Sequence, residues 1–222
     1  MGKQLKVGVL ASGNGSNLQA IINRCELGEL EAKVGCVITN RADAYALERA
    51  RKHGIPAIHL NHKDFSGREA YDAAVVAALQ AHSVELVVLA GFMRIITRVL
   101  LNAFPMAVMN IHPALLPSFP GLDAQKQALE HGAKLTGCTI HFVDEGTDTG
   151  PIIIQAAVPI LPEDTVETLS ARIHIQEHRI YPQAIQLFAQ GRLTVEGRRV
   201  VVTGSHCPED FSLINPAPCF FP

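Results

Sequence analysis

The segment LKVGVLASGNGSNLQAIINRC, residues 5–25, decides the fold class. Residues 5–11 form a short apolar run, a glycine-rich turn follows at residues 12–17, and apolar residues then recur at helical spacing as far as Cys25. This order is typical of a buried strand, a tight turn and a helix. The glycines allow the turn to expose backbone N–H groups, and the helix dipole favours an anion beside them. The turn therefore predicts a phosphate site, although glycine turns also serve as plain connectors.

The same alternation continues along the chain. Strands are expected at residues 34–39, 57–60, 84–90 and 107–111, and helices at residues 42–53, 68–82 and 97–104. The pattern continues with a helix at 122–131, strands at 136–143 and 152–160, a long helix at 165–190 that Pro182 is expected to bend, and a hairpin at 193–202. Alternation of this kind favours an α/β fold with a mostly parallel, doubly wound, Rossmann-like sheet and helices on both faces. We expect one domain over residues 1–204 and a loosely attached tail over residues 205–222.

Composition narrows the function classes. The 222 residues carry a net charge of −2 and no Lys/Arg block, so we expect neither a nucleic-acid partner nor a membrane surface. The five cysteines form no close pair and no metal-ligand spacing, which predicts no disulfide framework, no metal site and a cytoplasmic location. No apolar stretch long enough for a signal peptide precedes the first expected strand.

Two positions argue against a nicotinamide cofactor at the glycine turn. Leu18 stands where the third glycine of a dinucleotide fingerprint would lie. Asn40 follows the second expected strand, where an acidic residue would hold the cofactor ribose. The Gly-Lys-Ser/Thr ending of a P-loop is also missing, so the expected guest is a simple phosphate group.

Polar side chains end the expected strand that precedes His112. Asn110 and His112 are two residues apart, so an extended backbone places both on one face of the strand. They lie at the edge of the sheet where the glycine turn also emerges, and open α/β sheets bind ligands there. A carboxylate near His112 would hold its ring and favour the charged form, and Asp144, Glu145 and Asp148 are all candidates. A structural histidine and a solvated acidic turn are the alternatives.

Three further polar residues are each open to two interpretations. Glu177 interrupts the apolar stripe of the long helix, so its carboxylate either reaches a site beneath the helix or is solvated through a local rotation. Thr139 and His141 share a strand face and fit either support of the site or a buried hydrogen-bonded role.

Four ordered motifs closely resemble those of the phosphoribosylglycinamide formyltransferases. They are SGNGSNL at 12–18, LAGFMR at 89–94, NIHP at 110–113 with LLP at 115–117, and HFV at 141–143 followed by DTGP at 148–151. Four motifs in order are far more specific than any one of them. The resemblance covers roughly residues 5–195 and implies a formyltransferase fold. It also implies transfer of a formyl group from 10-formyltetrahydrofolate to the amine of glycinamide ribonucleotide, in purine biosynthesis.

The resemblance implies a role for each matching residue. Asn110 and His112 would stabilise the oxyanion formed at the formyl carbon, and Asp148 would position and charge the histidine. The ribonucleotide would be bound by the backbone of Gly15, Ser16 and Asn17 at its phosphate and by Glu177 at its ribose. The folate pocket would be formed by Met93, Arg94, Ile95, Ile96, Leu101, Asn110, Asp144 and Glu145. The implied partners are these small molecules, bound by a monomer or a homodimer.

Some residues depart from the family pattern, and related activities are alternatives. Ser118 stands where relatives commonly carry a basic residue, and Asp123 and Gln125 stand where histidines are frequent. A formyltetrahydrofolate deformylase would use the same three residues with water as the nucleophile, but such relatives usually carry an additional N-terminal domain. A methionyl-tRNA formyltransferase would add a basic C-terminal domain, for which this chain has neither length nor charge. A catalytically inactive phosphate- or folate-binding module is the alternative outside the enzymes.

Overall fold

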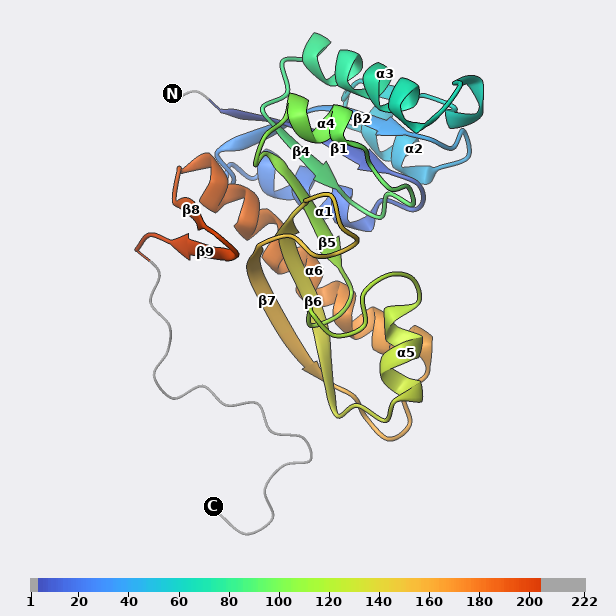
Figure 1. The fold of residues 1–222 in the computed structure, drawn as a ribbon, viewed down its shortest axis with the longest axis vertical. Helices are drawn as coiled ribbons and strands as arrows, with labels where there is room; N and C mark the ends of the chain where they lie inside the picture. Colours follow the sequence, from blue (N-terminus) through green and yellow to red (C-terminus); the bar gives the residue numbers. More distant parts are fainter. Residues whose placement is uncertain (1–3, 205–222) are drawn as a thin grey trace.

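The computed structural model describes residues 4–204, so the tail expected over residues 205–222 lies outside the described residues. This part of the chain is built on a nine-stranded sheet in the order β3-β2-β1-β4-β5-β6-β7-β9-β8 (Figure 1). The strands are β1 (Leu5–Ala11), β2 (Ala32–Thr39), β3 (Ala57–His59), β4 (Leu86–Leu89), β5 (Val108–His112), β6 (Leu135–Phe142), β7 (Ile152–Pro159), β8 (Leu193–Glu196) and β9 (Arg199–Val202). The helices are α1 (Ser16–Glu26), α2 (Tyr45–Lys52), α3 (Arg68–Ala81), α4 (Arg98–Ala103), α5 (Ala124–Glu130) and α6 (Val166–Ala189), with a short 3-10 helix at His62–Asp64.

Strands β1 to β5 form a parallel half-sheet. The expected fold class, a mostly parallel α/β sheet covered on both faces, is confirmed. Strand β6 instead runs antiparallel to both β5 and β7. An apolar strand pattern carries no direction, and the connection from β5 to β6 holds α5 and is long enough for a parallel crossover, so the sequence did not indicate the direction of β6 relative to β5. The connection from β6 to β7 at residues 143–151 is too short for the crossover that a parallel pair needs.

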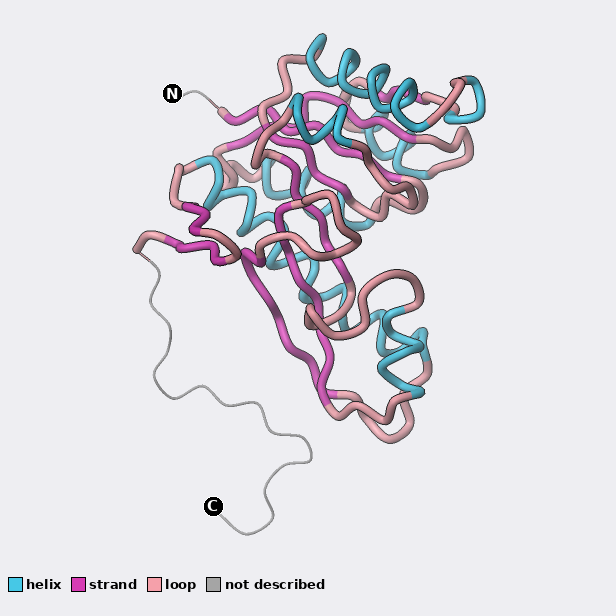
Figure 2. The backbone as a smooth tube through the Cα atoms, viewed as in Figure 1, coloured by secondary structure: helices cyan, strands magenta, loops and turns pink. Residues whose placement is uncertain are grey.

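Helices pack on both faces of the sheet. Apolar side chains of α1, α2, α5 and α6 pack with one face, and those of α3 and α4 pack with the other. Figure 2 shows the magenta strands running through the middle of the molecule with cyan helices to either side. Within residues 4–204, no helix has the length and apolar character needed to cross a membrane.

Most elements begin and end within a few residues of their expected bounds. Helix α2 begins at Tyr45 instead of residue 42, because the preceding residues form a turn closed by the Ala44 N–H and the Arg41 carbonyl. Pro182 lies inside α6, which continues from Val166 to Ala189.

The register of four neighbouring strands places the polar residues at one edge. Leu10 of β1 pairs with Leu89 of β4, and Leu89 pairs with Asn110 of β5. Asn110 in turn pairs with His141 of β6. These four paired residues lie near the carboxyl ends of β1, β4 and β5, where the glycine turn also leaves the sheet. Open α/β sheets bind their ligands at this edge.

Candidate active site

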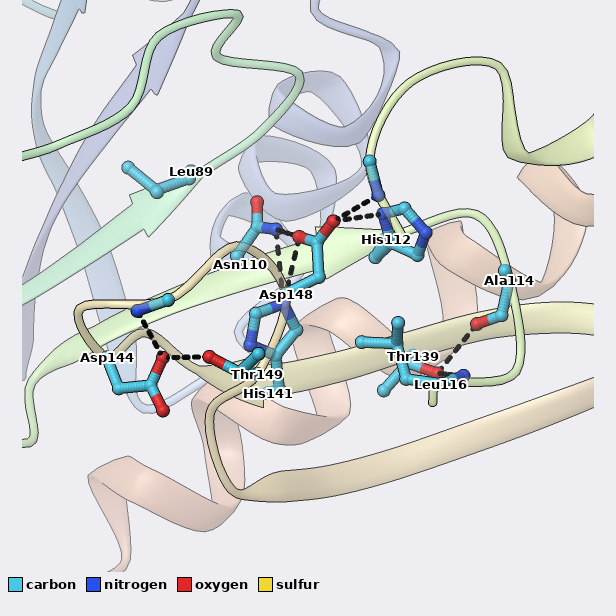
Figure 3. Close-up of polar contacts among 12 residues, drawn as sticks. Leu89, Asn110, His112, Ala114, Leu116, Thr139, His141, Asp144, Asp148 and Thr149 are labelled. Atoms are coloured by element: carbon cyan, nitrogen blue, oxygen red, sulfur yellow. Dashed lines mark hydrogen bonds and ion pairs between the residues drawn. The ribbon is translucent and has the colours of Figure 1, made fainter. Parts of the chain in front are cut away.

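Asn110 and His112 close β5 in extended backbone, and Ile111 between them is buried in the core on the other face. Their side chains therefore share one face, as the spacing predicted. His112 is buried, with 4% of its surface exposed. Figure 3 shows the side chain of Asp148 lying between Asn110 and His112.

The Asp148 carboxylate makes two short contacts and two long ones. Its Oδ2 atom lies 3.2 Å from His112 Nδ1 and accepts the Gly121 N–H at 2.9 Å. Its Oδ1 atom lies 3.4 Å from Asn110 Nδ2 and 3.7 Å from His141 Nε2. Of the three candidate carboxylates in this loop, Asp148 is therefore the one that the structure brings to His112.

The second nitrogen of His112 fixes how the ring is used. Its Nε2 atom lies 2.8 Å from the Phe119 carbonyl oxygen, which can accept a hydrogen bond but cannot donate one. Nε2 therefore carries a proton, and Nδ1 is the nitrogen that faces Asp148. Both ring nitrogens face acceptors, which is the hydrogen-bonding environment of a doubly protonated imidazole.

His141 supports Asn110 from the neighbouring strand. Burial lowers the pKa of His141 below its ordinary value, so its ring is neutral near neutral pH. Its Nδ1 lies 2.8 Å from the Phe142 carbonyl and donates to it, which leaves Nε2 as an acceptor. Asn110 Nδ2 donates to this Nε2 atom at 3.2 Å, and the amide is thereby oriented.

Thr139 fixes the turn that follows His112. Its hydroxyl donates to the Ala114 carbonyl at 2.7 Å and accepts the Leu116 N–H at 3.1 Å. Gln155 of β7 donates both to this hydroxyl, at 3.0 Å, and to the Leu116 carbonyl, at 2.8 Å. Thr139 itself is fully buried. The sequence left open whether Thr139 supports the site or is simply buried and hydrogen-bonded. Its contacts are those of a buried, hydrogen-bonded residue, and they fix the backbone next to His112.

The glycine turn has the form expected of an anion site. Gly15 precedes α1 with φ of 75°, and a Cβ atom there would lie 2.9 Å from the Ala46 Cβ, so the position requires glycine. The first intrahelical bond joins the Gln19 N–H to the Gly15 carbonyl, so the N–H groups of residues 16–18 have no partner one turn back. Arg49 of α2 holds the turn by donating to both the backbone and side-chain oxygens of Asn14, each at 2.8 Å.

Glu177 faces the start of α1 instead of solvent. It is 4% exposed, and its Oε2 atom accepts a hydrogen bond of 2.7 Å from Asn17 Nδ2. Burial raises the pKa of the Glu177 carboxyl above its ordinary value, and the bond from Asn17 opposes this shift. The Oδ1 atom of Asn17 is buried without a hydrogen-bond partner among the described residues. A buried acceptor of this kind is uncommon, and a bound hydroxyl or water would satisfy it.

The residues expected to hold a folate fall on two segments near the same edge. Residues 90–97 connect β4 to α4, and Met93 and Ile95 on this segment are 66% and 61% exposed. Glu145, in the loop that precedes Asp148, forms an ion pair of 2.6 Å with Arg98 of α4, so the two segments are joined. Asp144 organises its own loop by accepting hydrogen bonds from the Gly146 N–H and the Thr149 hydroxyl.

The other three expected folate residues lie on or next to α4. Ile96 and Leu101 pack against the core on the side of α3, and the Arg94 guanidinium lies 4.9 Å from the centre of the Tyr71 ring.

Of the residues that depart from the family pattern, Ser118 and Asp123 lie on the loop between His112 and α5, and Gln125 lies in the first turn of α5. Asp123 adopts a left-handed backbone with φ of 56° at the start of α5, a conformation that aspartate tolerates. Ser118 is exposed and Gln125 is half-buried. The same loop supplies the Phe119 carbonyl and the Gly121 N–H, so it contacts both His112 and Asp148 through its backbone.

Several residues that contribute to this edge of the sheet could not be assigned a role from the sequence. They are Phe119 and Gly121, which act through their backbone, Arg49 beside the glycine turn, and the buried side chains of Ser12, Asn40 and Asp72. A signal existed for Asn40, whose position at a strand end was already noted. Among the described residues, no group of three or more His, Cys, Asp and Glu side chains is arranged to hold a metal ion.

The fold and the site together define an α/β enzyme with an amide, an imidazole and a carboxylate at the carboxyl edge of its sheet. The model of the formyl transferase family matches residues 5–185, and the chain belongs to that family.

Individual relatives agree with this assignment. The chain is 43% identical over 204 residues to the phosphoribosylglycinamide formyltransferase of Escherichia coli strain K12, and the match covers 92% of this chain and 96% of that protein. It is also 50% identical over 207 residues to the trifunctional purine biosynthetic protein adenosine-3 of Drosophila pseudoobscura pseudoobscura, of which it spans 15%. The crystal structure of glycinamide ribonucleotide transformylase 1 from Symbiobacterium toebii superposes with a TM-score of 0.90 at 56% identity, over 91% of this chain and 95% of that one.

Proposed function

We propose that this chain transfers the formyl group of 10-formyltetrahydrofolate to the amine of glycinamide ribonucleotide, as a step of purine biosynthesis. The observation that carries the proposal is the contact of Asp148 with both His112 and Asn110 at the end of β5. The relatives named for this reaction support it, because the match covers nearly all of the Escherichia coli protein. We place the reaction in the cytoplasm, in a monomer or homodimer that binds small molecules and no nucleic acid.

The proposed chemistry is direct attack. The amine nitrogen bonds to the formyl carbon, the carbonyl oxygen gains negative charge, and the bond from that carbon to the folate nitrogen N10 then breaks. Asn110 and His112 stabilise the charged oxygen, the histidine through the Nδ1 proton that it shares with Asp148. The bond from Nε2 to the Phe119 carbonyl supports this assignment, because it leaves the Nδ1 proton on the side of Asp148, where the charged oxygen is proposed to form.

A proton must move from the amine to N10 during this reaction. We assign its first acceptor to Asp148 Oδ1. That oxygen has the two long contacts, of 3.4 Å and 3.7 Å, whereas Oδ2 is engaged at 2.9 Å and 3.2 Å. The less strongly bonded oxygen is the better proton acceptor, since it loses less when a proton binds.

The two substrates lie on either side of this centre in the proposal. The phosphate of the ribonucleotide takes the N–H groups of Gly15, Ser16 and Asn17, and its ribose hydroxyls reach Glu177. The unpartnered Oδ1 atom of Asn17 supports this placement, because a ribose hydroxyl would satisfy it. The folate lies along residues 93–96 and Leu101, with its pterin at the backbone of residues 144–148.

Folate turnover measured with and without glycinamide ribonucleotide tests the proposal. A transferase forms tetrahydrofolate only when the ribonucleotide is present. Equal rates with and without it would instead assign a formyltetrahydrofolate deformylase, in which water attacks the same carbon. Binding of the folate without turnover in either case would assign a binding module.

A further inference from the structure

Asn40 has an internal partner in place of a cofactor. It follows β2 at the carboxyl edge of the sheet and is 7% exposed. Its Oδ1 atom accepts a hydrogen bond of 2.6 Å from the hydroxyl of Ser12, at the end of β1. In a dinucleotide-binding fold, the residue at this position binds the ribose of the cofactor. Here the Asn40 amide instead bonds to Ser12, the first residue of the glycine turn.

Ser12 carries the connection further, to the segment between β4 and α4. Its Oγ atom accepts the Met93 N–H at 2.9 Å, and its own N–H donates to the Gly91 carbonyl at 3.0 Å. The Met93 N–H can act only as a donor, so the hydroxyl proton of Ser12 is free to bond to Asn40. The hydrogen bonds therefore run in one direction, from Met93 to Ser12 to Asn40, and Ser12 is 5% exposed.

Residues 90–97 form neither helix nor strand, and hydrogen bonds from outside the segment help to set their backbone. Phe92 and Ile96 pack against the core, whereas the side chains of Met93 and Ile95 are exposed. Ser12 fixes the backbone at Met93, and the carboxylate of Asp72, which is 3% exposed, accepts the Thr97 N–H at 2.5 Å. Two buried side chains thus hold the backbone at either end of the residues proposed to line the folate pocket.

We propose that Ser12 and Asn40 are positioning residues for the folate site, and that they tie it to the glycine turn that takes the ribonucleotide phosphate. The inference rests on the proposed function. Neither residue touches the reacting atoms. Ser12 sets the position of Met93 relative to Gly15–Asn17, and Asn40 orients the Ser12 hydroxyl so that its lone pair faces the Met93 N–H. Loss of the hydroxyl leaves the Met93 N–H without this partner, while the bond from the Ser12 N–H to the Gly91 carbonyl and the contacts of the glycine turn with α2 remain.

Steady-state kinetics of Ser12→Ala test this inference. We expect the KM for 10-formyltetrahydrofolate to rise about tenfold, from the loss of two buried hydrogen bonds, with the KM for glycinamide ribonucleotide within about twofold of the wild-type value. Ser12→Thr keeps the hydroxyl and is expected to restore most of the folate KM. The matched control is Thr39→Val, which removes a buried hydroxyl that donates to the Arg41 carbonyl at 2.8 Å, one residue from Asn40. This control is expected to lower the melting temperature and leave both KM values unchanged.

The other outcomes decide against the inference. An unchanged folate KM in Ser12→Ala would overturn it. An equal rise in the KM values for both substrates, or the same rise in folate KM in Thr39→Val, would also overturn it. If Ser12→Ala does not fold, Asn40→Ala is measured by the same criteria, because it removes the acceptor that orients the Ser12 hydroxyl toward the Met93 N–H.

Failure of the proposed function is recognised separately, because the wild-type protein would then not transfer the formyl group. Binding of tetrahydrofolate to wild type and Ser12→Ala, measured by calorimetry, would still test the positioning role. Equal affinities would contradict it.

Discussion

Replacing Asp148 by asparagine removes one negative charge from the site and changes little else. Asparagine has nearly the same size, and it tolerates the left-handed backbone that Asp148 adopts with φ of 55°. Alanine would add backbone strain to the loss of charge, so Asp148→Asn is the cleaner variant. The amide oxygen can still accept the Gly121 N–H, which bonds to Oδ2 in the wild-type protein at 2.9 Å.

The size of the effect follows from the distance between Asp148 and His112. Unit charges 3.2 Å apart attract by about 5 kcal/mol at an effective dielectric constant of about 20, which is an upper limit. Charge-assisted hydrogen bonds measured in proteins contribute roughly 1.5–3 kcal/mol. A loss of about 3–4 kcal/mol of transition-state stabilisation, close to that for an oxyanion donor, lowers kcat about 100- to 1000-fold.

The assay is single-turnover formation of formylglycinamide ribonucleotide with saturating substrates. Asp164→Asn is the matched control, because Asp164 is a buried carboxylate paired with Arg172 at 2.6 Å, away from the site. We expect this control to lose stability and keep its kcat. If Asp148→Asn kept kcat within about threefold of the wild-type value, His112 would not depend on this carboxylate and the assigned mechanism would be refuted.

Three further variants test individual parts of the structure. Burial raises the pKa of Glu177, so the folded protein holds that proton more tightly than the unfolded chain and loses stability as pH rises from about 4.5 through the raised pKa. Thermal melts should therefore show Glu177→Gln gaining more stability at pH 8 than at pH 5, with a higher KM for the ribonucleotide; equal gains would contradict the buried carboxylate. Thr139→Val leaves buried backbone groups of the turn at residues 114–116 unpaired. It should lower the free energy of unfolding in urea by about 2 kcal/mol and also lower kcat. An unchanged kcat would show that this turn does not position His112. Arg98→Ala breaks an exposed ion pair with Glu145 and should leave the urea midpoint unchanged, and a clear loss of stability would show that the pair holds the loop.

Much of the fold was predictable because its signals are local. Apolar periodicity and turn residues set the order of strands and helices, and the spacing of Asn110 and His112 placed both on one face. The direction of β6 relative to β5 was not predictable, since an apolar strand has the same pattern in either direction and the connection through α5 is long enough for a parallel crossover. Its pairing with β5 decides that His141 lies beside Asn110.

The contacts around the candidate site were less predictable because they depend on distant segments and unusual backbone conformations. Phe119 and Asp148 have positive φ, and nothing in a phenylalanine signals that its carbonyl will face a histidine seven residues away. The bond between Ser12 and Asn40 joins residues 28 positions apart and follows from the register of β1 and β2. The sequence could place Asn40 at a strand end but could not supply its partner.

Tracing the formyl carbon tests the central claim most directly. The 222-residue protein is mixed with folate labelled with carbon-13 at the formyl group and with glycinamide ribonucleotide, and the label is followed by NMR. Direct attack at the Asn110, His112 and Asp148 centre predicts that the label moves to the amine of the ribonucleotide at the rate at which tetrahydrofolate appears. Accumulation of the label in formate, or on the protein itself, would contradict that account.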